Sequence, residues 1–190
     1  MAKYTGYVTL PTDSYASWKA ATNGNGYDVD NSFGCQCWDL AAEFWWNVGF
    51  PQGYPTLAGT GSAYGAWNDR INNAGDKFDL IYNVSDIKVG DVIVFNYFTG
   101  NPYGHIGFAD EDYNGTNTIN ILSENNGGTP DPSGGAYTNV NSYDLQYFRG
   151  AFRYKDWHTT PPAPSGRERR GKFPWVLYAR NLRNNRNGVL

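Results

Sequence analysis

The chain has 190 residues, 40% of them hydrophobic, which is enough to bury the core of one compact domain. No apolar run reaches the ~18 residues of a membrane-spanning helix, which excludes such a helix. The opening segment MAKYT lacks the basic and then apolar pattern of a signal peptide. We therefore expect synthesis in the cytoplasm with no secretion route of its own.

Charge is distributed unevenly along the chain, whose net charge is −3. Residues 1–164 carry 8 Lys/Arg and 17 Asp/Glu, a net charge of −9, whereas residues 165–190 carry 7 Lys/Arg and one Glu, a net charge of +6. The acidic body and the basic end therefore suggest separate roles. Because nucleic-acid-binding domains are usually basic, we expect no nucleic-acid partner.

Helices are predicted in the first part of the chain. A short helix over 12–21, with Asp13 as its N-cap, precedes a loop rich in Asn, Asp and Gly. The strongest helix covers 37–48, because apolar residues recur there at helical spacing, and Gly49 follows its end. A third helix is predicted over 63–73.

Strands are predicted after the helices, over 91–97, 105–110, 118–124 and 146–154. This order indicates an α+β domain in which N-terminal helices pack on an antiparallel sheet. We place that domain at residues 1–157. A Pro-rich linker at 158–166 and a basic amphipathic tail at 167–190 complete the predicted organisation.

Cys37 and His105 are the candidate catalytic pair. Cys37 stands at a predicted helix start, where unpaired N–H groups favour a thiolate and can bind an oxyanion. His105 opens a strand after Gly104, and Glu124, at the end of the next strand, is expected beside it. A nucleophile, a base and an orienting acid would then be in contact. Cys35 is the rival nucleophile, but it lies in the loop before the helix. A disulfide between the two cysteines would be strained, so we expect free thiols.

Four short motifs resemble those of the CHAP family, the cysteine, histidine-dependent amidohydrolases/peptidases. They read Cys37-Trp38-Asp39-Leu40, Gly90-Asp91 followed by an apolar strand, Gly104-His105-Ile106, and Glu124-Asn125-Asn126, in this order within residues 12–157. The resemblance implies a papain-like fold and a triad of Cys37, His105 and Glu124, with Asn126 assisting. It also implies cleavage of an amide bond in bacterial peptidoglycan.

The loop before Cys37 carries a possible cation site. Alternating acidic residues in a flexible loop supply the hard oxygen ligands that Ca²⁺ prefers. Some phage-encoded members of the family bind calcium through a similar loop. That resemblance implies the side chains of three aspartates and backbone carbonyls at two further positions: Asp28, Asp30, Asp39, Ser32 and Gly34. The alternative is a solvated turn in which Asp39 caps the helix. We expect no organic cofactor.

Several functional alternatives stay open at this stage. We expect a monomeric peptidoglycan hydrolase, either an amidase or an endopeptidase. It would be a phage endolysin, released to the wall through a separate pore, or a virion-associated enzyme. A non-catalytic wall-binding module and a cysteine peptidase acting on protein are the other candidates. The basic tail suggests attraction to anionic wall polymers or a membrane surface.

Overall fold

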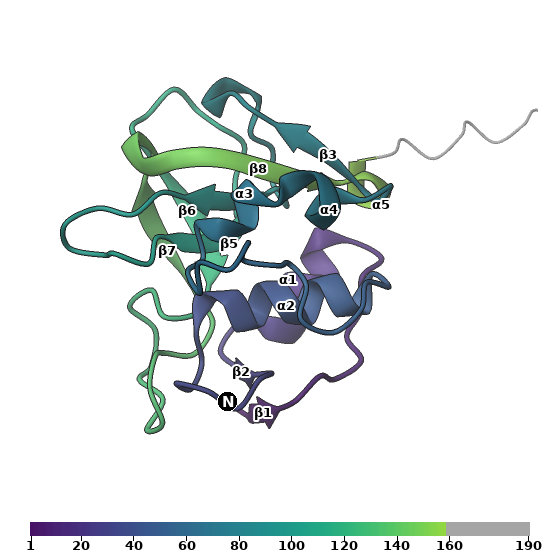
Figure 1. Cartoon of the computed structure of the whole chain (residues 1–190), viewed down its shortest axis with the longest axis vertical. Helices are drawn as coiled ribbons and strands as arrows, with labels where there is room; N and C mark the ends of the chain where they lie inside the picture. The colour runs from purple at the N-terminus through teal and green to yellow at the C-terminus, as the bar shows by residue number, and fades with distance from the viewer. Residues whose placement is uncertain (159–190) are drawn as a thin grey trace, which may run out of the picture. The chain divides into compact units, whose positions relative to one another are not determined.

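The structure, a computed structural model, describes residues 1–158 (Figure 1). The predicted tail at 167–190 and, apart from His158, the predicted linker lie outside the described residues. Within residues 1–158 the chain forms helices and an antiparallel sheet, which confirms the predicted α+β class. A separate pair of short parallel strands, β1 (Lys3–Thr5) and β2 (Gly26–Asp28), joins the start of the chain to the acidic loop.

The helices follow the prediction with two differences. α1 (Tyr15–Thr22) begins later than expected, because Ser14 rather than Asp13 accepts the capping hydrogen bond from the Ser17 N–H at 3.2 Å. The predicted third helix is two short helices, which are separated at Asp69. The remaining helices are α2 (Cys37–Asn47), α3 (Gly65–Asn68), α4 (Arg70–Ala74) and α5 (Lys155–His158). In the described part of the chain, no helix is long and apolar enough to cross a membrane.

Six antiparallel strands form the main sheet, in the order β3-β8-β4-β5-β6-β7. Two of them, β3 and β7, were not predicted, since the first is short and the second is an edge strand rich in polar residues. Short 3-10 turns precede β4 and β8. The strands are β3 (Phe78–Ile81), β4 (Val92–Phe95), β5 (His105–Ala109), β6 (Thr118–Ser123), β7 (Asn139–Asp144) and β8 (Phe148–Tyr154), and the turns are η1 (Val84–Asp86) and η2 (Leu145–Tyr147).

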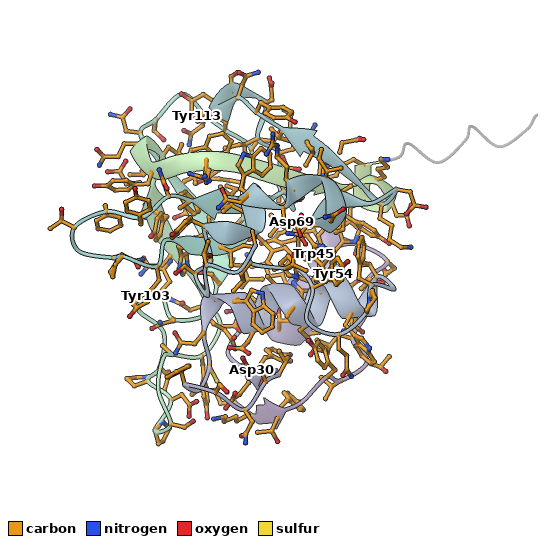
Figure 2. The ribbon with its side chains drawn as sticks, in the orientation of Figure 1. Asp30, Trp45, Tyr54, Asp69, Tyr103 and Tyr113 are labelled. Atoms are coloured by element: carbon orange, nitrogen blue, oxygen red, sulfur yellow. The ribbon has the colours of Figure 1, made fainter. Side chains whose placement is uncertain are left out.

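The sheet buries both of its faces, because successive side chains of β4 and β5 alternate between two apolar clusters. On one face α1 and α2 pack together, with the ring centroids of Trp18 and Phe44 4.9 Å apart, and bring a group of aromatic rings against the sheet. One example is Trp45 of α2, which is labelled in Figure 2. Its ring stacks on that of Phe78 in β3, with ring centroids 4.6 Å apart. α2 also contacts β5, the strand that begins at His105.

Candidate active site

Cys37 is the first residue of α2, and hydrogen bonds fix the residues around it. The Gln36 N–H donates to Asp39 Oδ2 at 3.0 Å, so a carboxylate in the first turn caps the helix start. The Gln36 side chain donates through Nε2 to the Phe33 carbonyl at 2.7 Å and accepts through Oε1 from Asn125 at 2.8 Å. Cys37 therefore stands where the free N–H groups of α2 begin, in the predicted position.

Burial decides the protonation state of the Cys37 thiol. Desolvation raises the pKa of Cys37 to about 12, although hydrogen bonding by the backbones of Ile106 and Trp38 acts in the opposite direction. Desolvation therefore acts against the thiolate that the helix N-terminus is expected to favour. A thiol with a raised pKa needs a base to take its proton.

His105 is the first residue of β5 and is buried, with 3% of its surface exposed. Its ring lies parallel to that of Tyr143 in β7, with centroids 4.8 Å apart and planes at 8°. Gly104 before it has a φ of 67°, and a Cβ there would lie 2.5 Å from the Phe95 carbonyl oxygen, so glycine is required at this turn. Burial lowers the pKa of His105 to about 3, so the imidazole is neutral and keeps a lone pair on one ring nitrogen.

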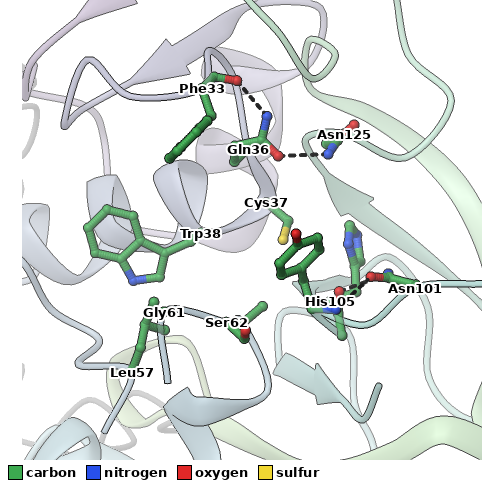
Figure 3. Close-up of a pocket in the computed structure, with 13 residues that line it drawn as sticks. Phe33, Gln36, Cys37, Trp38, Leu57, Gly61, Ser62, Asn101, His105 and Asn125 are labelled. Atoms are coloured by element: carbon green, nitrogen blue, oxygen red, sulfur yellow. Dashed lines mark hydrogen bonds between the residues drawn. The ribbon is translucent and has the colours of Figure 1, made fainter. Parts of the chain in front are cut away.

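Cys37 and His105 line one pocket of about 350 Å³, with the Cys37 sulfur turned into it (Figure 3). The thiol comes from a helix start and the imidazole from a strand start, so two rigid elements position the pair. This arrangement can support attack of the sulfur on the carbonyl of a bound chain. Aromatic and apolar side chains form much of the remaining wall: Phe33, Trp38, Leu57 and Tyr103.

Glu124 does not form the predicted contact with His105, and the assisting role of Asn126 stays a prediction. Glu124 Oε1 accepts hydrogen bonds from the Tyr27 N–H at 2.5 Å and from Thr138 Oγ1 at 3.4 Å, and its Oε2 has no hydrogen-bond partner within residues 1–158. Burial raises the pKa of Glu124 well above its usual value. Asn126 accepts through its carbonyl from Asn141 at 3.1 Å. Neither residue forms a hydrogen bond to His105 in this part of the chain.

Ser123 meets His105 instead. Ser123 Oγ lies 2.9 Å from Nε2 of the imidazole, and Ser123 is fully buried. The physical reason is the alternation of side chains along β6, since residue 123 points to the side of His105 and residue 124 to the opposite side. The expected contact between Glu124 and His105 is therefore replaced by one from the residue before it.

Three of the predicted calcium ligands come together. Carboxylate oxygens of Asp28, Asp30 and Asp39 lie within 4.8 Å of one another. Asp28 is 3% exposed, and its Oδ1 has no hydrogen-bond partner in the described residues. Burial raises the pKa of Asp39 to about 8, and the charges of Asp30 and Asp28 add to the rise. The three side chains thus present carboxyl oxygens to one place in the loop.

The other contacts of this loop come from Ser32, Gly34 and Lys3. The Ser32 N–H donates to Asp30 Oδ1 at 2.9 Å. Gly34 has a φ of 72° and packs so closely on Gly134 that a Cβ would lie 2.2 Å from its carbonyl oxygen. Lys3 Nζ lies 3.1 Å from Asp28 Oδ2 and 2.7 Å from Asp131 Oδ2, and so joins the acidic loop to the loop after β6.

Comparison with known families covers most of this site. A family model described as the CHAP domain matches residues 22–125, more than half of the chain. The chain belongs to the CHAP domain family. The matched range includes the acidic loop, Cys37, His105 and Ser123, and the family resemblance stated from the four sequence motifs is thus confirmed.

Proteins related to this CHAP chain include a curated phage enzyme and solved endolysins. The "D-alanyl-L-alanine endopeptidase" of Streptococcus phage B30 is 35% identical over 145 residues, which are 76% of this chain and 31% of the phage protein. The crystal structure of the endolysin LysIME-EF1 has a TM-score of 0.56 and 24% identity, covering 77% of this chain and 65% of that one. The structure of Ly7917 has a TM-score of 0.46 and 20% identity, covering 76% and 63%. The chain thus spans about a third of the phage relative and less than two thirds of the endolysin.

Two residues of this CHAP domain were missed from the sequence, Ser123 and Tyr143. Ser123 directly precedes the motif that drew attention to Glu124, and strand alternation alone does not say which of two adjacent residues faces a histidine on the neighbouring strand. Gly107 carried a usable signal. A Cβ at residue 107 would lie 2.8 Å from Ser123 Cβ, so the second glycine of the GHIG segment leaves space for this serine.

Proposed function

We propose that this chain is a peptidoglycan hydrolase that cleaves an amide bond with Cys37 as nucleophile and His105 as base. The observation that carries the proposal is the pocket shared by the two side chains, each at the start of a rigid element. The name of the phage B30 relative, an endopeptidase, favours peptide cross-links as the target over the bond between sugar and peptide.

The chemistry begins from a neutral thiol and a neutral imidazole. His105 takes the Cys37 proton as the sulfur attacks the amide carbonyl, and the backbone N–H of Cys37, at the first turn of α2, donates to the oxyanion. The imidazolium then protonates the leaving amine, and a thioester remains on Cys37. His105 next removes a proton from water, which attacks the thioester and releases the free thiol and a carboxylic acid.

Mass spectrometry of the fragments released from purified peptidoglycan tests this function. We expect soluble fragments with new amine and carboxyl ends from the unaltered chain and none from Cys37→Ala. The nature of the new ends distinguishes an endopeptidase from an amidase. Equal release by both forms would contradict a Cys37 hydrolase. Digestion of casein but not of walls would favour a protein peptidase, and wall sedimentation without release would favour a binding module.

We also propose that the acidic loop binds Ca²⁺ through Asp28, Asp30 and Asp39, with backbone carbonyls near Ser32 and Gly34 as further ligands. The buried, unpartnered Asp28 Oδ1 and the mutual repulsion at Asp39 support the proposal, because a hard divalent cation would relieve both. The bound cation would supply charge neutralisation and hold the loop that leads into Cys37.

Isothermal calorimetry with CaCl₂ and thermal unfolding in EDTA test the cation site. We expect a saturable heat and a fall of the melting temperature in EDTA. Asp30→Asn should weaken both effects, and Asp76→Asn, an exposed aspartate outside the loop, should leave both unchanged. Absence of heat together with a melting temperature that EDTA does not change would rule the site out.

The bacterial wall is the proposed place of action, whether the enzyme reaches it as an endolysin or on a virion. Residues 167–190 lie outside the described residues, and the proposal that they bind anionic wall polymers or membrane surfaces rests on their charge. Deletion of residues 165–190 should reduce sedimentation with walls at low salt. Unchanged sedimentation would contradict a role of the tail in attachment.

A further inference from the structure

The wall of the pocket around Cys37 holds no counter-ion for a charged ligand. Of the residues that the structure describes, thirteen line it, and none of these is Asp, Glu, Lys or Arg (Figure 3). His105 is neutral because burial lowers its pKa to about 3. Transfer of the Cys37 proton to His105 separates charge within the pair but leaves the summed charge of the wall at zero.

Hydrogen bonds among the amide side chains of the wall decide which of their atoms stay unpaired (Figure 3). Gln36 Nε2 donates to the Phe33 carbonyl, and its Oε1 accepts from Asn125 Nδ2. This order leaves Asn125 Oδ1, an acceptor, without a hydrogen-bond partner within residues 1–158. Asn101 Nδ2 donates to the Gly104 carbonyl at 2.8 Å. The side-chain amide donors are therefore used within the protein, and a carboxylate, which can only accept, finds no partner among them.

The backbone donors of the pocket act at the reacting sulfur. Burial is the main cause of the raised pKa of Cys37, and hydrogen bonds from the backbones of Ile106 and Trp38 oppose it. The positive end of α2 also lies at Cys37, and the Asp39 carboxylate already caps it through the Gln36 N–H. These donors suit the carbonyl under attack and leave nothing for a second negative group beside it.

Arg149 brings a positive charge near the pocket but does not line it. Its guanidinium carbon lies 5.8 Å from the ring centroid of Tyr64, the residue after Ala63 of the wall. Its Nη1 donates to Asn96 Oδ1 at 3.1 Å and its Nη2 to Asn68 Oδ1 at 2.6 Å. The guanidinium is thus committed to neighbours outside the pocket.

We propose that this pocket selects peptides that have no free carboxylate on the residues flanking the scissile bond. A carboxylate would lose water on entering and gain neither a cation nor a side-chain donor. A carboxamide or a further peptide bond instead supplies an N–H group for Asn125 Oδ1. The preferred wall peptides are those whose nearby carboxyl groups are amidated or joined in cross-links. The inference rests on the proposed cleavage at Cys37.

Two synthetic peptides that differ in one group test this selection. Both are acetylated on their amino groups and share the same sequence, which ends with a D-alanyl-L-alanine bond, the bond named for the phage B30 relative. One ends in a carboxamide directly after that bond and the other in a free carboxylate. We expect kcat/KM to be about 10- to 100-fold higher for the carboxamide peptide.

A cation placed at the pocket should weaken the preference. Tyr103 lines the pocket and is 66% exposed, so Tyr103→Lys should fold normally. We expect this variant to lower the ratio of the two kcat/KM values several-fold, through a gain on the carboxylate peptide. Tyr103→Gln, which is uncharged, is the matched control and should keep the ratio even if both rates change. Because each ratio is measured within one protein, a general loss of activity cancels.

Calorimetric titration of Cys37→Ala with the two peptides measures the same preference without turnover, and we expect tighter binding of the carboxamide form. Such binding without cleavage by the unaltered chain would defeat the proposed function and support the selection. The proposal is overturned if both peptides are cut equally well, if the carboxylate peptide is preferred, or if Tyr103→Lys leaves the ratio unchanged. Failure of both peptides to bind and to be cut would also overturn it.

Discussion

Asp39 Oδ2 accepts a hydrogen bond from the backbone N–H of Gln36, the residue directly before Cys37. The other oxygen of the same carboxylate accepts from the Val29 N–H at 3.1 Å, at the beginning of the acidic loop. One side chain therefore connects the cation cluster to the start of the helix that carries the nucleophile. Changes in the loop should reach the active site through this carboxylate.

Asp39→Asn should destabilise the protein and remove its response to calcium. An amide has one acceptor oxygen, so either the buried Val29 N–H or the part-buried Gln36 N–H would lose its partner, at a cost of about 1–3 kcal/mol. Thermal unfolding with CaCl₂ and with EDTA measures both effects, and Asp76→Asn is the control. An undiminished rise of the melting temperature with calcium in Asp39→Asn would contradict a ligand role for this aspartate.

Alkylation should distinguish the two free thiols. Cys35 is fully buried and its Sγ lies 3.3 Å from Asp131 Oδ2, and burial raises its pKa, so iodoacetamide should leave it unmodified in the native protein. We expect one label, at Cys37, by intact mass and peptide mapping. His105→Ala should slow this labelling because the neutral thiol then lacks its base. Native labelling of Cys35 in Cys37→Ala would show that the buried thiol is accessible after all.

Glu43→Gln should change how stability depends on pH. Burial raises the pKa of Glu43 to about 7, although the Val8 N–H and Asn47 act against the rise. The folded protein thus keeps a proton that the unfolded chain releases, so the stabilisation is complete below the unfolded pKa and is lost as pH rises through 7. Relative to Glu43→Gln, the unaltered protein should lose up to about 3 kcal/mol between pH 4 and 8. Urea unfolding across this pH range measures the free energy of unfolding of both proteins. If the two free energies changed with pH in parallel, the prediction would be wrong.

Phe33→Ala should weaken substrate binding without affecting folding. Phe33 lines the pocket, is 84% exposed and has a φ of 65°, an uncommon conformation for an aromatic residue with no packing role. We expect KM on a soluble wall peptide to rise several-fold at constant melting temperature. Ile71→Ala, 67% exposed on α4 and not part of the pocket wall, is the matched control. If Phe33→Ala and Ile71→Ala changed KM equally, Phe33 would have no specific role in substrate binding.

Much of the fold follows from patterns that local physics imposes. The apolar spacing of α2 and its ending at Gly49 predict that helix almost to the residue, because one face must pack on the sheet. β7 was not predicted, because an edge strand with polar side chains lacks the apolar alternation that burial produces in a sequence. The break between α3 and α4 at Asp69 was not predicted either. The apolar residues keep helical spacing across it, although the helical backbone is interrupted there.

The sequence predicted which elements meet at the site, but it predicted fewer of the contacts between individual residues. Cys37 and His105 could be named because a helix start and a strand after glycine limit where their side chains point. Tyr143 comes from the strand that was not recognised, so its stacking on His105 could not be foreseen. The protonation state of Cys37 depends on how much water reaches the sulfur, which is a property of the packed pocket.

The ammonium of Lys3 also bears on where this domain can be cut for transfer into chimeric enzymes. The family match covers 22–125, yet a segment with those ends would lack Lys3, which pairs with the buried carboxylates of Asp28 and Asp131. It would also lack Asp131 itself and Tyr143, and would expose one side of the sheet. A transplantable unit must therefore begin before β1 and end after β8, so that Lys3 and every strand of the main sheet stay with the nucleophile.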